Sequence, residues 1–144
     1  MSAGKATKAY SLRIKRVYEP ATEGDGLRVL VDRLWPRGPT KAKAAIDLWL
    51  KDVAPSDALR RMIHADPEKW SAFVAAYGRE LEREPASSAA ATLRAHWRTG
   101  PVTLLYASRN ETRNNAVVLK EWLEANEVKQ SGAKSRARRA QSSR

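Results

Sequence analysis

The sequence contains no cysteine among its 144 residues. This absence excludes disulfide bonds, thiol nucleophiles and every metal site with cysteine ligands. It is also typical of a reducing compartment. No apolar run approaches the ~20 residues of a membrane-spanning helix, and the first ten residues lack the apolar stretch of a signal peptide. We therefore expect a cytoplasmic protein with no membrane partner.

Motifs for metals, phosphates and nucleophiles are equally scarce. The two histidines, His64 and His96, are isolated and lack the spacing of metal ligands. The glycines form no phosphate-cradling loop. Ser108 follows an apolar run but lacks the glycine-flanked turn and the basic partner of a nucleophile. The sequence thus predicts no metal site and no cofactor, and it identifies no catalytic residue.

The net charge of +11 belongs mostly to the two ends of the chain. Residues 129–144 contain six basic side chains and residues 1–10 contain two, and neither segment contains an acid. Subtracting these eight charges from +11 leaves a net charge of +3 for the rest of the chain. Because neither end has apolar periodicity, we expect 1–10 and 128–144 to be disordered around one domain, residues 11–127. The basic tail is either a solvated extension or a nonspecific nucleic-acid contact through phosphates. Its candidate contact residues are Lys134, Arg136, Arg138 and Arg139.

Three segments have the patterns of strands. Residues 11–18 alternate apolar and basic side chains, and residues 27–34 are rich in valine and leucine. Residues 101–107 form a nearly continuous apolar run, which is typical of a strand covered on both faces of a parallel sheet. The eight-residue link 19–26 is shorter than a parallel crossover normally needs. The first two strands are therefore expected to be antiparallel, or not to be neighbours.

Helical patterns fill most of the remaining chain. One helix is expected from Thr40 to just before Pro55, and Ser56 caps a second, short one. Asp66 and Pro67 begin a third, and further helices are expected over 88–97 and 114–125. The order predicts an α/β fold, with a short, about three-stranded, mostly parallel or mixed sheet packed by about five helices.

Polar side chains are dense at the carboxyl ends of the predicted strands, where α/β proteins bind ligands. Arg16 continues the inward-facing positions of its strand, where a charge needs a partner, and Asp32 is one candidate for that partner. The alternatives are a structural ion-pair network and an anion site in which arginines bind a phosphate or carboxylate. The expected ligand-binding residues are Arg16, Tyr18, Asp32, Arg33, Arg37, Arg109, Glu111 and Asn114.

Several strings resemble one bacterial family. They are KRVYEP from Lys15, RVLVDRLWPRG from Arg28, APS from Ala54 with Leu59-Arg60, HADP from His64, and LLYAS from Leu104 with Asn114 and Ala116. Together they resemble the YeaO-like proteins, which belong to a superfamily labelled a domain of unknown function. The resemblance covers about residues 11–125 and is strongest in the string from Arg28. It implies an α/β fold, suggests that the first two strands are parallel, and carries no established activity.

The same resemblance marks the start of the last helix. Longer relatives have a Cys-His pair there, close relatives of this shorter type usually have Asn-His, and the matching positions here are Asn114 and Asn115. The loss of both groups weakens any mechanism that needs an imidazole or a thiol at this place.

Three function classes follow from these observations. The first is a cleft at the strand ends that binds a small anionic, phosphate- or nucleotide-like ligand, with or without catalysis. The second is a noncatalytic nucleic-acid-binding or regulatory module that uses the basic tail. The third is a partner-binding protein that docks through Trp35 or Trp49. The sequence does not determine the oligomeric state.

Overall fold

The structure is a computed structural model that describes residues 10–38 and 41–126. It has an α/β fold built on a four-stranded sheet with the strand order β1-β4-β2-β3. Every neighbouring pair of strands is parallel. The described residues contain no helix that is both long and apolar enough to span a membrane.

The three predicted strands are present, each shorter than expected, and a fourth is added. The strands are β1 (Leu12–Arg16), β2 (Leu27–Leu30), β3 (Leu48–Trp49) and β4 (Val102–Tyr106). All five residues of β4 are buried, as expected for a central parallel strand. The sequence did not predict β3, because a strand of two residues is too short to show the alternation of apolar and polar side chains. Its place depends on pairing with Val29 and Leu30.

β1 and β2 are parallel, but they are not neighbours, because β4 lies between them. Of the two arrangements left open for the short link, the antiparallel one is wrong. The link instead crosses over β4, and at Gly26 the backbone lies so close to Pro101, just before β4, that a Cβ there would clash with the Pro101 carbonyl oxygen. Gly26 also has a positive φ of 63°, which favours glycine.

The helix expected from Thr40 to just before Pro55 is wrong beyond Ala44. α2 covers only Lys41–Ala44, and Ala45 then adopts a φ of 52°, which ends the helix. The other predicted helices are present. They are α3 (Asp57–Ala65), α4 (Trp70–Leu81), α5 (Ala86–Thr99) and a helix over residues 115–126, with short 3₁₀ turns at Glu23–Asp25, Lys51–Val53 and Pro67–Lys69.

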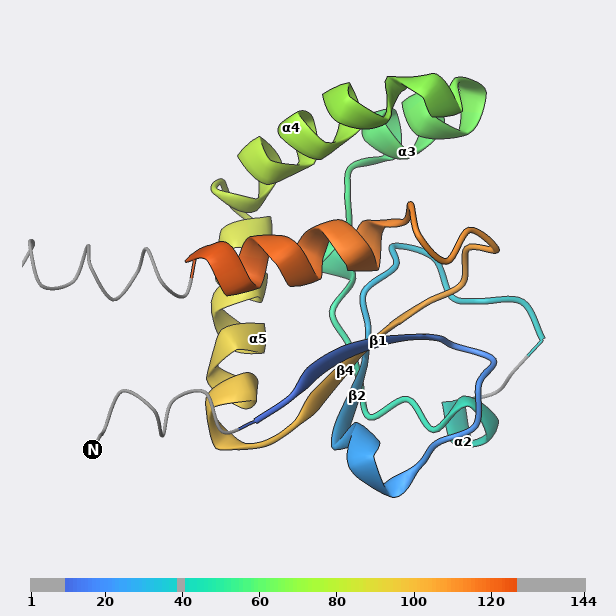
Figure 1. The fold of residues 1–144 in the computed structure, drawn as a ribbon, viewed down its shortest axis with the longest axis vertical. Helices are drawn as coiled ribbons and strands as arrows, with labels where there is room; N and C mark the ends of the chain where they lie inside the picture. Colours follow the sequence, from blue (N-terminus) through green and yellow to red (C-terminus); the bar gives the residue numbers. More distant parts are fainter. Residues whose placement is uncertain (1–9, 39–40, 127–144) are drawn as a thin grey trace, which may run out of the picture.

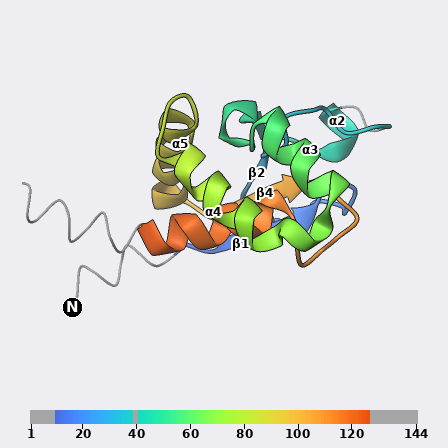
Figure 2. The same ribbon diagram turned by 90° about the horizontal axis from the view of Figure 1, so that it is seen from above.

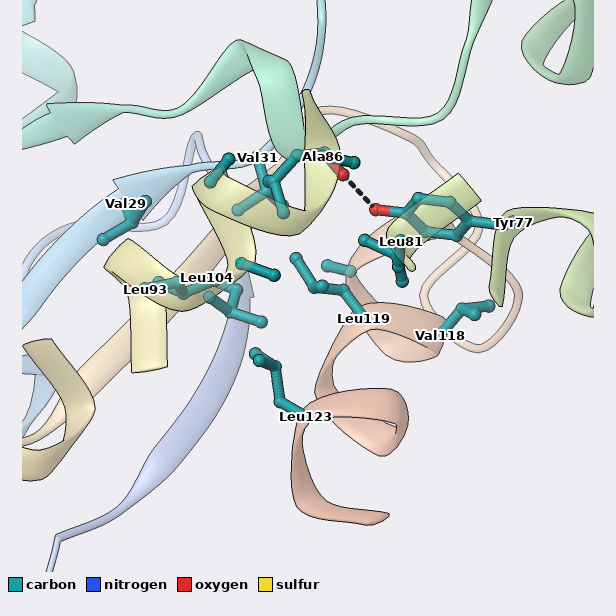
Figure 3. Packing of buried hydrophobic residues seen from close by; sticks show 14 of the residues in the cluster. Val29, Val31, Tyr77, Leu81, Ala86, Leu93, Leu104, Val118, Leu119 and Leu123 are labelled. Carbon is teal, nitrogen blue, oxygen red and sulfur yellow. Dashed lines mark hydrogen bonds between the residues drawn. The ribbon is translucent and has the colours of Figure 1, made fainter. Parts of the chain in front are cut away.

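One face of the sheet carries the main hydrophobic core. Figures 1 and 2 show α5 and the 115–126 helix on this side of the sheet and α2 on the other. Side chains from β2, β4, α4, α5 and the 115–126 helix interlock there (Figure 3). Tyr77 is fully buried in this core, and its hydroxyl donates to the Val53 carbonyl oxygen at 2.6 Å. The buried phenol thereby has the partner that burial demands.

The other face of the sheet holds a small apolar cluster beside a buried group of charges. Val17, Leu30 and Leu105 pack there with Ala44 of α2 and Ile46. Next to them Asp25 is 1% exposed and accepts from Arg28 Nη1 at 2.7 Å and from Lys15 Nζ at 2.9 Å. We refer to Lys15, Thr22, Asp25 and Arg28 as the Asp25 cluster; Thr22 Oγ1 donates to Asp25 at 2.8 Å.

Candidate functional site

A cleft of about 590 Å³ opens at the carboxyl ends of the strands. In Figure 1 the strands run upward, so these ends point toward α3 and α4. Figure 2, seen from above, shows the same two helices lying across that end of the sheet. We call this hollow the strand-end cleft. Its lining comes from the segment after β2, from α3 and α4, and from the segment between β4 and the last helix.

Five of the predicted site residues line the strand-end cleft and three do not. Those that line it are Tyr18, Asp32, Arg33, Arg37 and Asn114. Those that do not are Arg16, Arg109 and Glu111, of which the last two are exposed on the loop that follows β4. The candidate nucleic-acid contacts Lys134, Arg136, Arg138 and Arg139 lie outside the described residues, as do the expected disordered segments except for Tyr10.

Arg16 holds two strand ends together and is not paired with Asp32. Its Nε donates to the Ser108 carbonyl oxygen at 3.0 Å and its Nη2 to the Ala107 carbonyl oxygen at 3.1 Å. Its guanidinium also stacks on the ring of Tyr18, 4.9 Å from the centroid. Arg16, which was expected to face the interior, is half-buried, and backbone carbonyl groups are its hydrogen-bond partners. This fits the structural alternative rather than a ligand contact.

Asp32 lies where β2 meets the loop after β4. One carboxylate oxygen accepts from the Ala107 N–H at 2.9 Å, and the other accepts from Asn115 Nδ2 at 3.1 Å. Burial raises the pKa of the Asp32 carboxyl above its ordinary value, although these two hydrogen bonds act in the opposite direction. Asp32 therefore ties three segments together at the floor of the cleft.

The two asparagines at the start of the last helix have separate roles. Asn114 is buried and caps the helix, because its Oδ1 accepts from the Val117 N–H at 2.9 Å. Asn115 donates from Nδ2 to both the Val31 carbonyl oxygen, at 3.0 Å, and Asp32. Both amides are thus engaged in hydrogen bonds inside the protein.

Arg33 reaches across to the segment that precedes α3. Its Nε donates to the Pro55 carbonyl oxygen at 3.1 Å and its Nη2 to the Ala54 carbonyl oxygen at 3.3 Å. Both of these residues are buried, so their carbonyl groups need a partner inside the protein. Arg37 is exposed at the rim, and its backbone carbonyl accepts from the Tyr18 hydroxyl at 3.3 Å.

The wall opposite the strand ends comes from α3, which the sequence interpretation did not assign to the site. α3 begins at Asp57, because the Ser56 side chain accepts from the Leu59 N–H at 3.3 Å. Arg60, Ile63 and His64 then face the cleft. Their spacing of three and four residues marks one helix face, so this face could have been identified from the sequence, but nothing local showed that it lies against the strand ends.

The second contribution that the sequence did not predict is Arg113 with two aromatic rings of α4. Trp70 and Phe73 stack with centroids 5.3 Å apart, and the Arg113 guanidinium lies 5.8 Å from the Trp70 ring centroid. All three residues line the cleft. This contact joins residues far apart in the sequence, so no local pattern predicts it.

The charge balance of the cleft favours anions. Among the described residues that line it, Arg33, Arg37, Arg60 and Arg113 face a single acid, Asp32. In the described parts of the chain, no three side chains of His, Cys, Asp or Glu come together in a way that would hold a metal ion.

Next to the cleft lies a small exposed apolar rim. Leu34 is 58% exposed and Trp49 is 37% exposed. The rings of Trp35 and Trp49 meet edge to face with centroids 5.2 Å apart, and Trp49 Nε1 donates to the Asp32 carbonyl oxygen at 2.8 Å. Both tryptophans thus have contacts within the protein.

Comparison with known proteins places this sequence among a set of bacterial relatives. A family model described as the inactive DUF488-N3 subclade matches residues 11–143. The uncharacterized protein YeaO of Escherichia coli strain K12 is 41% identical over 114 residues, which is 78% of this chain and 96% of that protein. The uncharacterized proteins Rv3073c of Mycobacterium tuberculosis and Mb3100c of Mycobacterium bovis are each 42% identical over 112 residues, 78% of this chain and 92% of theirs. These matches confirm the YeaO-like resemblance, and no solved structure is a significant match.

Proposed function

The chain belongs to the inactive DUF488-N3 subclade, and we propose that it binds a small anionic ligand in the strand-end cleft without transforming it. The ligand we infer is phosphate- or nucleotide-like. The observation that carries the proposal is the lining itself, in which four arginines face one aspartate beside several aromatic rings.

The size and chemistry of the cleft support this proposal. Its volume of about 590 Å³ lies in the range of roughly 300–1,000 Å³ that is usual for small-molecule sites. Arginine is the side chain best suited to bind phosphate and carboxylate groups through paired N–H donors. Tyr18, Trp35 and Phe73 add apolar ring surface for the rest of a ligand.

The engaged amides favour binding over catalysis. Asn114 and Asn115 occupy the positions where the resemblance places Cys-His or Asn-His, and an amide neither titrates nor attacks at neutral pH. Both amides are also committed to internal hydrogen bonds. The description of the matched subclade as inactive agrees with this interpretation.

Thermal unfolding of the full chain tests the proposal with inorganic phosphate, mononucleotides and sugar phosphates. A ligand at about 100 times its dissociation constant adds ~2.7 kcal/mol of stability, which raises the Tm of a domain of this size by roughly 4 °C or more. No rise with any probe would overturn the proposal.

A second candidate function uses the basic tail. Six basic residues and no acid in 129–144 favour nonspecific contact with nucleic-acid phosphates. The matched variant is the full chain with Lys134, Arg136, Arg138 and Arg139 all changed to Gln, titrated with a short labelled oligonucleotide at several salt concentrations. Binding that falls steeply with salt and disappears in this variant supports the tail. Binding that survives in it contradicts this role.

A further inference from the structure

The arginines of the strand-end cleft differ in how many of their N–H donors remain for a ligand. Arg33 donates hydrogen bonds from Nε and Nη2 to backbone carbonyl oxygens, as Arg16 does next to the cleft. An arginine committed in this way can still add charge, but it has lost part of the donor fork that grips a phosphate. The anion contact is therefore to be sought among the other arginines of the lining.

Arg113 is an exposed residue whose side chain has one contact that uses none of its N–H donors. Its guanidinium carbon lies over the Trp70 ring, 5.8 Å from the centroid, and Trp70 in turn stacks on Phe73. Such a cation–π contact favours this position of the side chain and leaves its N–H groups available to a ligand. Among the described residues, no hydrogen bond or ion pair engages the Arg113 side chain.

Arg60 on α3 presents donors from the helical wall of the same cleft. Its Nε is buried and has no hydrogen-bond partner among the described residues. Its ion pair within the described part of the chain is a long contact of 3.4 Å from Nη2 to Asp57, whose side chain is 54% exposed. A buried N–H without a partner costs stability. Because Nε is covered by protein atoms, a ligand in the cleft would contact Arg60 through its terminal nitrogens, and Nη1 has no hydrogen-bond partner among the described residues.

From these three observations we infer that Arg60 and Arg113 together form the anion contact of the cleft, and that its ligand is a phosphate monoester of an apolar or aromatic organic group. This inference rests on the proposed function and names the residues and the ligand class. Two guanidinium groups match the double charge that a phosphate monoester carries near neutral pH.

The organic group follows from the remainder of the lining. A cleft of about 590 Å³ is far larger than a bare phosphate needs. Beyond the arginines, its wall includes apolar side chains from two sides, namely Trp35 after β2 and Ile63 and Phe73 on the helices. Such a surface favours a planar or apolar moiety over a sugar alone.

Isothermal titration of the full chain with AMP, adenosine and inorganic phosphate tests the inference. The expected order of affinity is AMP above phosphate, with adenosine weakest. R60Q and R113Q are each expected to weaken AMP binding about 10-fold or more, because each removes charge-assisted hydrogen bonds to the phosphate. R113K, which keeps the charge but lacks the planar fork, is expected to weaken it as well.

R61Q is the matched control, because Arg61 is an exposed neighbour on α3 that does not line the cleft. It removes the same charge and is expected to leave AMP affinity within about 2-fold. The Tm of each variant without ligand shows whether it is folded. Should R113Q unfold, R60Q still decides, since the Arg60 side chain is 37% exposed and its loss is tolerable.

The outcomes separate this inference from the proposed function. If AMP binds the wild type but R60Q and R113Q bind it equally well, the anion contact lies elsewhere and only this inference is overturned. The same holds if R61Q weakens binding as much as they do. Phosphate binding as tight as AMP overturns the organic part, and adenosine binding as tight as AMP overturns the anion part. If no probe binds the wild type, the proposed function falls too.

Discussion

The Asp25 cluster and the strand-end cleft are two charged regions of the same sheet with opposite arrangements. In the Asp25 cluster, Asp25 is 1% exposed and accepts from Lys15, Thr22 and Arg28. The Arg28 guanidinium further donates to carbonyl oxygens of the α2 region and of Glu19, so its donor groups are used within the protein. In the cleft, by contrast, the contact of the Arg113 guanidinium with the Trp70 ring uses no N–H donor, and Arg60 Nε has no partner among the described residues.

The difference teaches how to tell a structural charge from a ligand-binding one. A buried charge whose hydrogen bonds are satisfied inside the protein contributes to the fold, and its removal exposes its partners to an uncompensated burial cost. A charge whose donors face a cleft contributes little to the fold and is free to bind. Substitutions in the two regions should therefore divide into losses of stability and losses of affinity.

The largest expected effect is that of D25A. Removing the carboxylate leaves Arg28, whose side chain is 3% exposed, without its counter-charge. We expect the free energy of unfolding to fall by about 3–5 kcal/mol, measured by urea unfolding followed by tryptophan fluorescence. E124A breaks the exposed Lys120–Glu124 pair and, as a control, should cost less than about 0.5 kcal/mol. A loss below about 1 kcal/mol in D25A would contradict the structural role of the cluster.

The Asp25 cluster also makes the stability of the fold depend on pH in the acid range. Burial tends to raise the pKa of Asp25, but the hydrogen bonds from Lys15, Thr22 and Arg28 outweigh it and hold this pKa well below its ordinary value. A depressed carboxyl pKa contributes stability above the unfolded-state value of about 4, and this stability is lost as pH falls through the folded-state pKa. The wild type should therefore lose stability relative to D25A below about pH 4.

An intermediate effect is expected for D32N at the floor of the cleft. The amide replaces one acceptor oxygen by an N–H group, which then faces the N–H of Ala107 or the amide of Asn115. We expect a loss of about 1–3 kcal/mol, measured by the same urea unfolding. A variant as stable as the wild type would show that Asp32 does not tie these segments together.

The difference in unfolding free energy between wild type and D32N should change with pH in the opposite direction to the difference between wild type and D25A. Burial raises the pKa of Asp32, so the folded protein holds this proton longer than the unfolded chain. The stability that Asp32 contributes to the folded protein therefore falls as pH rises from about 4 through its raised pKa. The stability gap between wild type and D32N should narrow over this window. A gap that widens with rising pH would contradict a raised pKa.

The sheet was largely predictable because its signals are local. The apolar run of β4 and the alternation of β1 depend only on which faces are covered. The errors lie where tertiary contacts decide. β3 exists because Leu48 and Trp49 pair with β2, and the helix that ends at Ala44 is limited by a single left-handed residue, Ala45.

Only part of the candidate site could be predicted, because some of its lining also depends on tertiary contacts. The rule that ligands bind at strand ends located the cleft and found Asp32, Arg33 and Arg37. It could not locate the wall formed by α3 or the stacking of Arg113 on Trp70, because these depend on how the helices dock. Nor could it distinguish Arg33, whose donors are consumed by backbone carbonyls, from an arginine with donors to spare.

The smallest expected effects come from a pair of neighbouring arginines, and they test this distinction directly. R33Q removes the donors to two backbone carbonyls of buried residues, so it should cost about 1–2 kcal/mol of unfolding free energy. R37Q removes an exposed side chain at the rim of the cleft and should stay within about 0.5 kcal/mol of the wild type. Both variants lose one positive charge from the same loop, so the overall field changes alike. Equal stability of the two variants in urea would mean that the carbonyl contacts of Arg33 contribute nothing to the fold, and Arg33 would then join Arg60 and Arg113 as a candidate for the ligand.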